Sequence, residues 1–236
     1  MTADPGGRAS LSTISPQGYW MTFADHRDQD QRLGHVALGP HSIPGAHCEN
    51  CDRPLHRLLS LDVRDPRLGL ASMPFTRLHL LSCPTCEERP RPFFYGIRED
   101  DSVAVFKHGW GGRSEQFPYP DYPDHFPARA LSFAEVTPPE QEILRQINQR
   151  GPNFDQFTDL YEDELGVIRH QYGGEPFLIQ LTENPACPLC GKAMPIVAAL
   201  GDEIAPEPGF HANCGVQMLW FLCPRCAVVA AVEECD

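Results

Sequence analysis

The chain has 236 residues, 42% of them hydrophobic, and its 32 acidic and 19 basic residues give a formal net charge of −13 at pH 7. This composition suits a globular protein with a buried core, and no apolar stretch is long enough to span a membrane. The scattered basic residues form no patch for phosphates, which excludes a nucleic-acid binder. Residues 1–17 lack a secretory pattern, so we expect a disordered tail on a cytoplasmic protein.

Alternating apolar residues predict a β-rich first region at residues 18–112. A strand is predicted at residues 18–24, and a second at residues 77–81 leads into a cysteine pair. Residues 92–97 and 102–107 are predicted to form a hairpin. An apolar stretch at residues 58–61 completes the region.

Residues 113–166 are predicted to connect this region to a second one. Proline and aromatic residues are dense at residues 113–136, so we expect neither helix nor central strand there, but a linker or an arm packed over the other half. Residues 153–164 are compatible with a second, acidic helix.

One helix is predicted at residues 138–150. Thr137 and Glu140 have the spacing of a capping box, in which the N-cap and the third helical residue bond each other's backbone. Ile143, Leu144 and Ile147 form an apolar stripe that is typical of core packing.

A second β-rich region is predicted at residues 167–236. Apolar residues 196–200 and an alternating strand at residues 216–221 precede the last cysteine pair. The expected fold is therefore mainly β with a few helices (α+β).

Eight of the ten cysteines form four CxxC pairs. The gaps between pairs are 31 residues in the first region and 32 in the second, which groups the pairs into two tetrads. The predicted ligands are Cys48, Cys51, Cys83 and Cys86 for one metal site, and Cys187, Cys190, Cys223 and Cys226 for the other.

The spacing within each pair lets one tight turn direct both sulfur atoms at the same ion, and two such turns complete a tetrahedron. Four thiolate ligands favour Zn²⁺, so we predict two structural zinc ions. Iron binds the same ligand set, and redox-active or disulfide-bonded pairs and unpaired core thiols stay open as alternatives. A closed site of four cysteines leaves no position for a catalytic water.

Several further residues lie close to the tetrads in sequence. Cys214 and Cys235 lie outside the pairs and are interpreted as inert thiols. His41, His47 and His211 are the alternative ligands if a cysteine is not used.

The two tetrads have similar surroundings, and one sequence offset, without a gap, relates Leu33 to Tyr172 and Cys48 to Cys187. Each first pair is followed by apolar residues and then by a strand that runs into the second pair. We therefore predict that an internal duplication produced two related, zinc-stapled, β-rich halves.

The run at residues 173–180, Cys187-Pro188-Leu189-Cys190-Gly191 and the aromatic strand before Cys223 resemble the bacterial YwqG-like family of uncharacterised proteins. They are also similar to the eukaryotic programmed cell death protein 2 group. The match covers mainly residues 169–230. The first half retains the cysteines but lacks the Gly-Gly-x-Pro motif that residues 173–176 form in the second half. The resemblance implies a binding role, as a chaperone of a basic protein or as an immunity protein.

The resulting hypothesis is a zinc-stabilised, non-enzymatic module that binds a protein partner, with no nucleic acid or membrane involved. One alternative is an enzyme of unknown reaction, using His170 with Glu175, or the carboxylates Asp159, Glu162 and Glu164. Another is a zinc or redox sensor that releases metal when its thiolates are oxidised.

Overall fold

A computed structural model represents the protein. It describes residues 12–24, 36–37, 43–49, 52–83, 92–106, 128–149, 165–166, 169–180, 183–201 and 216–235. Over these ranges the protein is mainly β, as predicted, with a single α-helix, α1 (Pro138–Gln149), and a 3-10 turn, η2 (Pro66–Leu68).

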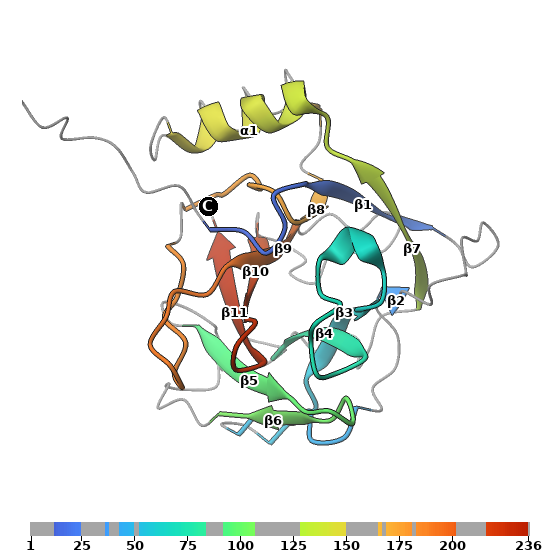
Figure 1. Cartoon of the computed structure of the whole chain (residues 1–236), viewed down its shortest axis with the longest axis vertical. Coiled ribbons are helices and arrows are strands. Elements are labelled where there is room, and N and C mark those ends of the chain that lie inside the picture. Colours follow the sequence, from blue (N-terminus) through green and yellow to red (C-terminus); the bar gives the residue numbers. More distant parts are fainter. Residues whose placement is uncertain are drawn as a thin grey trace, which may run out of the picture.

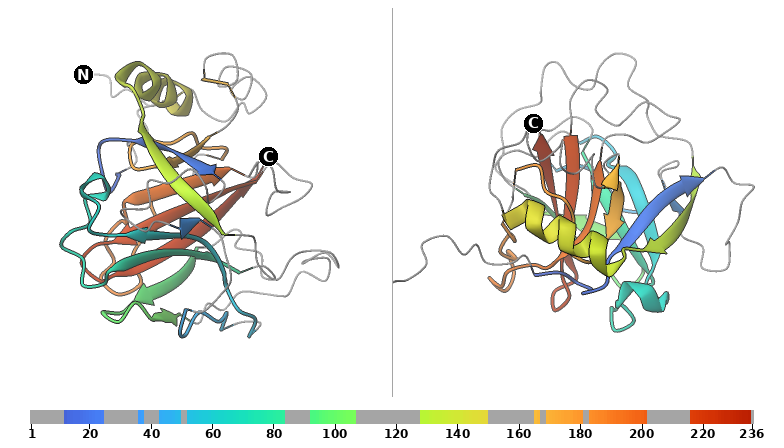
Figure 2. Two further views of the ribbon diagram at one scale, coloured as in Figure 1. Left: turned by 90° about the vertical axis from the view of Figure 1, so that its right-hand side faces the viewer. Right: turned by 90° about the horizontal axis from the view of Figure 1, so that it is seen from above.

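Eleven strands form one sheet in the order β4-β3-β2-β7-β1-β8-β9-β10-β11-β5-β6. Every pairing between neighbouring strands is antiparallel. The sheet is strongly twisted, and α1 lies across it at one end of the molecule (Figures 1 and 2). The strands are β1 (Tyr19–Ala24), β2 (Val36–Ala37), β3 (His56–Asp62), β4 (Arg77–Ser82), β5 (Phe93–Ile97), β6 (Val103–Val105), β7 (Arg129–Glu135), β8 (His170–Tyr172), β9 (Ile196–Gly201), β10 (Val216–Cys223) and β11 (Val228–Cys235).

Strand β10 shows how the sequence fills both faces of this sheet. Side chains alternate across a strand, so odd and even positions enter different layers. Met218, Trp220 and Leu222 belong to the largest core cluster, whereas Leu219 and Phe221 belong to a second cluster on the opposite face. Both faces of β10 are therefore buried, which explains why its sequence is apolar almost throughout.

Helix α1 begins with the predicted capping box. The Thr137 backbone N–H donates to Glu140 Oε2 at 2.7 Å, and the Glu140 N–H donates to Thr137 Oγ1 at 3.4 Å. Leu144 and Ile147 are buried in a third core cluster, against which Ile143 is partly buried. The prediction of the helix and of its apolar stripe is confirmed.

The prediction that residues 113–136 contain no central strand is wrong for β7. This strand lies between β2 and β1 in the middle of the sheet. Proline is confined to the part of the segment that ends at Pro127, and residues 128–136 contain none, so nothing prevents them from donating ladder hydrogen bonds. The composition of the whole segment concealed this local change.

Residues 12–17 also differ from the expected disordered tail. The Ile14 N–H donates to the carbonyl of Ile196 at 2.8 Å, and the Ile196 N–H donates to the carbonyl of Ser12 at 2.8 Å. These residues therefore form a short parallel bridge with the beginning of β9.

Candidate metal centre

Four cysteines of the second region converge on one point of the structure. The Sγ atoms of Cys187, Cys190, Cys223 and Cys226 all lie within 4.8 Å of one another. Cys187 and Cys223 are buried, and the other two are partly exposed. The sequence therefore predicted this tetrad correctly as one cluster capable of holding a metal ion.

The first pair lies in a turn that we call the Cys187 turn, residues 185–194. The Cys187 N–H donates to the Lys192 carbonyl at 2.8 Å, and the Gly191 N–H donates to the Cys187 carbonyl at 2.8 Å. Gly191 has a φ of 69°, a left-handed conformation that glycine adopts without steric cost. These bonds fold the chain back on itself, so both sulfur atoms point to the same side.

The second pair lies in the turn between β10 and β11. The Cys226 N–H donates to the Cys223 carbonyl at 3.2 Å, and Ala227 has a φ of 53°. The Ala227 carbonyl accepts from the Ile97 N–H at 2.9 Å, which attaches this turn to β5. Two long strands and a neighbouring strand therefore hold the second pair in place.

The sulfur–sulfur spacing fits a tetrahedral metal site. Cys190 Sγ and Cys223 Sγ are 3.7 Å apart, whereas a disulfide bond is about 2.05 Å long. A tetrahedron with Zn–S bonds of about 2.3 Å has edges of about 3.8 Å. The four cysteines of this cluster form no disulfide bond, and the cluster has the spacing of a ligand set.

The protonation of these thiols responds to their backbone and to their burial. A backbone hydrogen bond from Lys192 lowers the pKa of Cys190 to about 7. Burial raises the pKa of Cys223, and that of Cys226 to about 12, with neighbouring thiols raising the latter further. Four thiolates so close together need a cation between them, because only its charge offsets their mutual repulsion.

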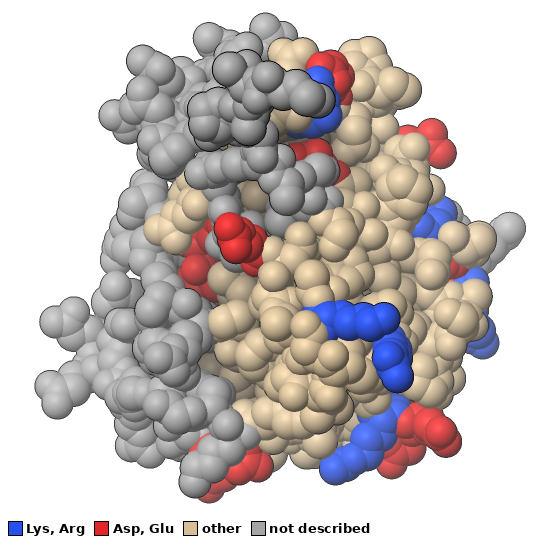
Figure 3. Space-filling model, turned by 60° about the vertical axis from the view of Figure 1, so that its left-hand side comes forward, with Lys and Arg blue, Asp and Glu red and all other residues tan. Residues whose placement is uncertain are grey.

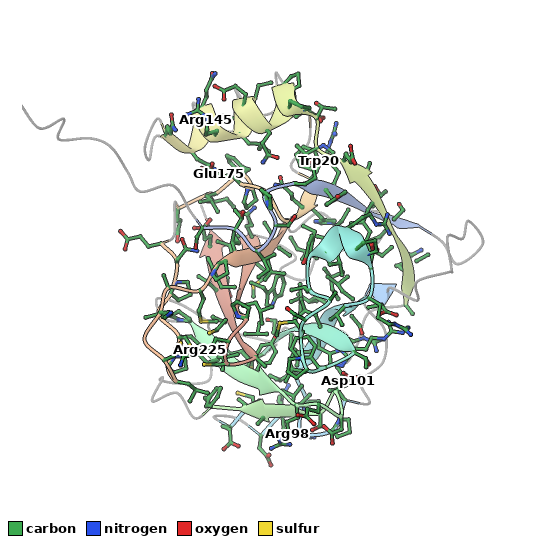
Figure 4. All side chains as sticks on the ribbon, in the orientation of Figure 1. Trp20, Arg98, Asp101, Arg145, Glu175 and Arg225 are labelled. Carbon is green, nitrogen blue, oxygen red and sulfur yellow. The ribbon has the colours of Figure 1, made fainter. Side chains whose placement is uncertain are left out.

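Two basic residues adjoin the cluster: Lys192 follows the first pair, and Arg225 lies inside the second. Both side chains are exposed, and Arg225 lies near the β10–β11 turn (Figure 4). A zinc ion with four thiolates carries a formal charge of −2, which adjacent cations offset. These two residues were not among the predicted site residues, although their positions beside cysteines were a usable signal in the sequence.

The first tetrad is described only in part. Cys48 and Cys83 are buried, with 1% and 5% exposure, much like Cys187 and Cys223. Their predicted partners Cys51 and Cys86 lie outside the described residues. The structure therefore describes one cysteine from each pair of the predicted first tetrad.

The backbone at residues 46–49 and 52–55, which we call the Cys48 turn, has hydrogen bonds in common with the Cys187 turn. The Cys48 N–H donates to the Arg53 carbonyl at 2.9 Å, and the Asp52 N–H donates to the Cys48 carbonyl at 2.8 Å. Asp52 adopts a φ of 59°, the conformation that Gly191 has at the equivalent position. The two turns therefore present their first cysteine in the same way.

The alternative ligands have no place in the described cluster. The side chain of His47 is exposed, beside the Cys48 turn, and Cys235 ends β11. His41, His211 and Cys214 lie outside the described residues. Within the described part of the chain, the tetrad of the second region consists of its four predicted cysteines.

The predicted catalytic residues do not form a described site. His170 is buried and stacks on Phe23 at 4.7 Å, and burial lowers its pKa to about 4. Its Nδ1 has no hydrogen-bond partner among the described residues. Burial raises the pKa of Glu175, which lies beneath α1 near Arg145 (Figure 4). Asp159, Glu162 and Glu164 lie outside the described residues.

Within the part of the chain that the structure describes, no helix has the length and apolar character needed to cross a membrane. In comparisons with known protein families, curated proteins and solved structures, none matches the chain.

Proposed function

We propose that the protein is a zinc-stabilised, non-enzymatic module that binds a protein partner. The observation that supports this best is the convergence of Cys187, Cys190, Cys223 and Cys226 on one point of the structure, with two of the four side chains buried. Four thiolates fill the coordination shell of Zn²⁺, so such an ion stabilises the fold and offers no site for a substrate or a water molecule. Free thiols held for a metal also suit a reducing compartment, which is why we assign the protein to the cytoplasm.

The same reasoning extends to a second zinc ion in the first half. The Cys48 turn and the Cys187 turn share their backbone hydrogen bonds, and Cys83 is as buried as its counterpart Cys223. We propose that Cys51 and Cys86 complete this first-half site and that the halves arose by internal duplication. Likeness of the two turns supports this proposal because unrelated turns seldom repeat the same bonding and burial features together.

The partner that we propose is a basic protein. The described ranges carry 11 of the 19 Lys and Arg residues but only 14 of the 32 Asp and Glu residues. Most of the negative charge therefore belongs to other parts of the chain. On the face in Figure 3 the described charged residues of both signs are interspersed on a mostly uncharged surface. Acidic segments that attract a basic partner fit the chaperone-like or immunity-type role implied by the resemblance to the YwqG-like and programmed cell death protein 2 groups.

Metal analysis of the purified protein tests the structural part of this proposal. We expect two zinc ions per chain, one in the Cys187→Ser and Cys48→Ser variants, and two in the Cys235→Ser control. A content of one ion in the parent chain would refute the first-half site alone. Absence of zinc, presence of iron, or release of zinc at low peroxide would replace the structural-zinc assignment with one of its alternatives.

The proposed binding of a protein partner is tested by isolating a defined complex. A partner recovered from the source cell should be basic, should reassociate with the purified chain in a fixed ratio, and should bind more weakly as salt rises. An acidic protein of similar size serves as the control. Failure to recover any partner, together with turnover of a substrate by the zinc-loaded protein, would overturn the non-enzymatic assignment.

A further inference from the structure

The order of strands in the sheet is alike for three strands in each direction from the neighbouring pair β7 and β1. Outward from β7 come β2, β3 and β4, and outward from β1 come β8, β9 and β10. In chain order, however, β1 precedes β2, and β7 precedes β8. In chain order β1 is thus the first strand of the first half and β7 the first strand of the second half. In the sheet, however, β1 lies beside β8 of the second half, and β7 lies beside β2 of the first half.

The outer strands match in register as well as in order. The β3–β4 pairing skips Leu58, and the β9–β10 pairing skips Val197. The sequence offset between these two residues is the same as that between Cys48 and Cys187. A β-bulge at a fixed point of a hairpin is a specific local feature, so its presence at equivalent positions relates β3–β4 to β9–β10. Both bulge residues are buried in the largest core cluster.

The shared register extends inward to β2 and β8. Val36 of β2 lies opposite Ser60 of β3, and Gln171 of β8 lies opposite Ala199 of β9. Ser60 and Ala199 have the same offset as the two bulge residues, so Val36 corresponds to Gln171. The offset is smaller at this inner strand, so the prediction of one offset without a gap is wrong here. The halves differ in length between the inner strand and the first cysteine pair.

The central strands are related through the same residues. Val36 lies opposite Ala130 of β7, and Gln171 lies opposite Trp20 of β1. The pairing alone therefore makes β7 the counterpart of β1, with Ala130 equivalent to Trp20.

The sequences of β1 and β7 agree with this assignment, although the register was derived without them. At the corresponding positions β1 has Met-Thr-Phe-Ala (residues 21–24) and β7 has Leu-Ser-Phe-Ala (residues 131–134). Met21 and Leu131 are both buried, with 4% and 7% exposure. Thr22 and Ser132 lie directly opposite each other, which places the local two-fold axis between them.

We infer that the protein consists of two like halves that exchange their first strands. The inference rests on the proposed duplication and adds to it: β1 completes the second half by pairing with β8, and β7 completes the first half by pairing with β2. Each half is thus the binding partner of the other through a strand edge. Neither half alone can satisfy the backbone groups along the inner edge of its own sheet.

The exchange of strands predicts that a destabilising substitution in a first strand should raise amide hydrogen exchange in the opposite half. We would insert a protease site between residues 107 and 127 of the full chain, cleave it, and follow amide hydrogen exchange in the nicked protein. Met21→Ala should raise exchange in β8 and β9 by about tenfold or more relative to β2 and β3. Leu131→Ala should have the reverse effect.

Two results would overturn the inference. One is faster amide hydrogen exchange in the half whose own first strand carries the substitution, and the other is separation of the nicked halves under native conditions. If an alanine variant fails to fold, the milder Met21→Val and Leu131→Val pair gives the same comparison. The pattern of exchange does not depend on metal content or on a partner, so failure of the proposed function would be seen separately in the zinc and binding assays.

Discussion

The outer edges of β4 and β10 show how two similar halves are completed differently. In the second half, β10 turns at Cys223 and Cys226 into β11, which pairs with it along its whole length. In the first half, β5 follows the cysteine segment but pairs with β11 of the other half instead of with β4. Among the described strands, none pairs with the outer edge of β4.

Side chains take the place of that missing strand. Tyr95 Oη accepts from the Leu81 N–H at 2.9 Å and donates to the His79 carbonyl at 2.8 Å. Trp220 Nε1 donates to the Leu81 carbonyl at 3.0 Å. Two aromatic side chains thus form hydrogen bonds with backbone groups at the outer edge of β4, whereas the outer edge of β10 pairs with strand β11. The outer edges of two similar hairpins therefore both need hydrogen-bond partners, but different chemical groups can supply them.

The largest effect that we expect separates the metal ligands from the other cysteines. Cys187→Ser should lower the free energy of unfolding by about 3 kcal/mol or more, which corresponds to a melting temperature lower by roughly 10 °C, because a metal ligand is lost. Cys235→Ser is the control and should change little. Thermal unfolding monitored by circular dichroism measures both, and equal melting of the two variants would contradict the ligand assignment.

Cys48→Ser extends this test to the first half. If both halves hold zinc, its effect should approach that of Cys187→Ser. A small effect would break the equivalence of the Cys48 and Cys187 turns.

Buried histidines should make both halves sensitive to acid. Burial lowers the pKa of His170 to about 4, and burial also lowers the pKa of His79 to about 4, although Asp101 acts in the opposite direction on His79. The unfolded chain binds these protons near pH 6.5, so stability is full above that pH and is lost as the pH falls toward 4.

The variant His170→Phe should remove part of that loss. Phenylalanine retains the ring contact with Phe23 and does not titrate. Between pH 6.5 and 4, the variant should therefore lose up to about 3 kcal/mol less unfolding free energy than the parent protein does. Denaturant titrations at several pH values measure this difference. Replacement of the exposed His47 is the control, and an unchanged pH dependence for His170→Phe would show that the ring is not buried as neutral histidine.

Tyr95→Phe tests the completion of the β4 edge. The change leaves the Leu81 N–H and the His79 carbonyl without their partner, and we expect a loss of about 2 kcal/mol. Tyr172→Phe is matched to it, because Tyr172 donates one hydrogen bond to the Leu68 carbonyl at 2.7 Å. Its loss should be about 1 kcal/mol, and equal losses would argue against the special role of Tyr95.

The smallest effect concerns the two turns. Asp52 occupies a left-handed conformation that favours glycine, so Asp52→Gly should stabilise the protein by about 0.5 kcal/mol. The reciprocal change Gly191→Asp should destabilise it by about 1 kcal/mol. Its added Cβ meets no atom within 4 Å among the described residues, so the cost is conformational. Effects of the same sign would mean that the turns are not equivalent.

Several features could be predicted from the residues because each depends on a short stretch of chain. The capping box at Thr137 and Glu140 requires two side chains three positions apart. Strand β10 alternates between two cores, which produces a continuous apolar run. Strand β7 was missed because prolines earlier in the same segment dominated its composition and concealed the proline-free stretch that follows Pro127.

By itself, the sequence determined the grouping of the second tetrad, the helix and several of the strands, since these follow from local periodicity and turn geometry. Only the tertiary structure decided the order of the strands, the pairing of β1 with β8 and of β7 with β2, and the bonding of the β4 edge by Tyr95 and Trp220. The physical reason is that the backbone groups that join strands are the same at every residue. Which strand edges meet is settled by packing among residues far apart in the chain.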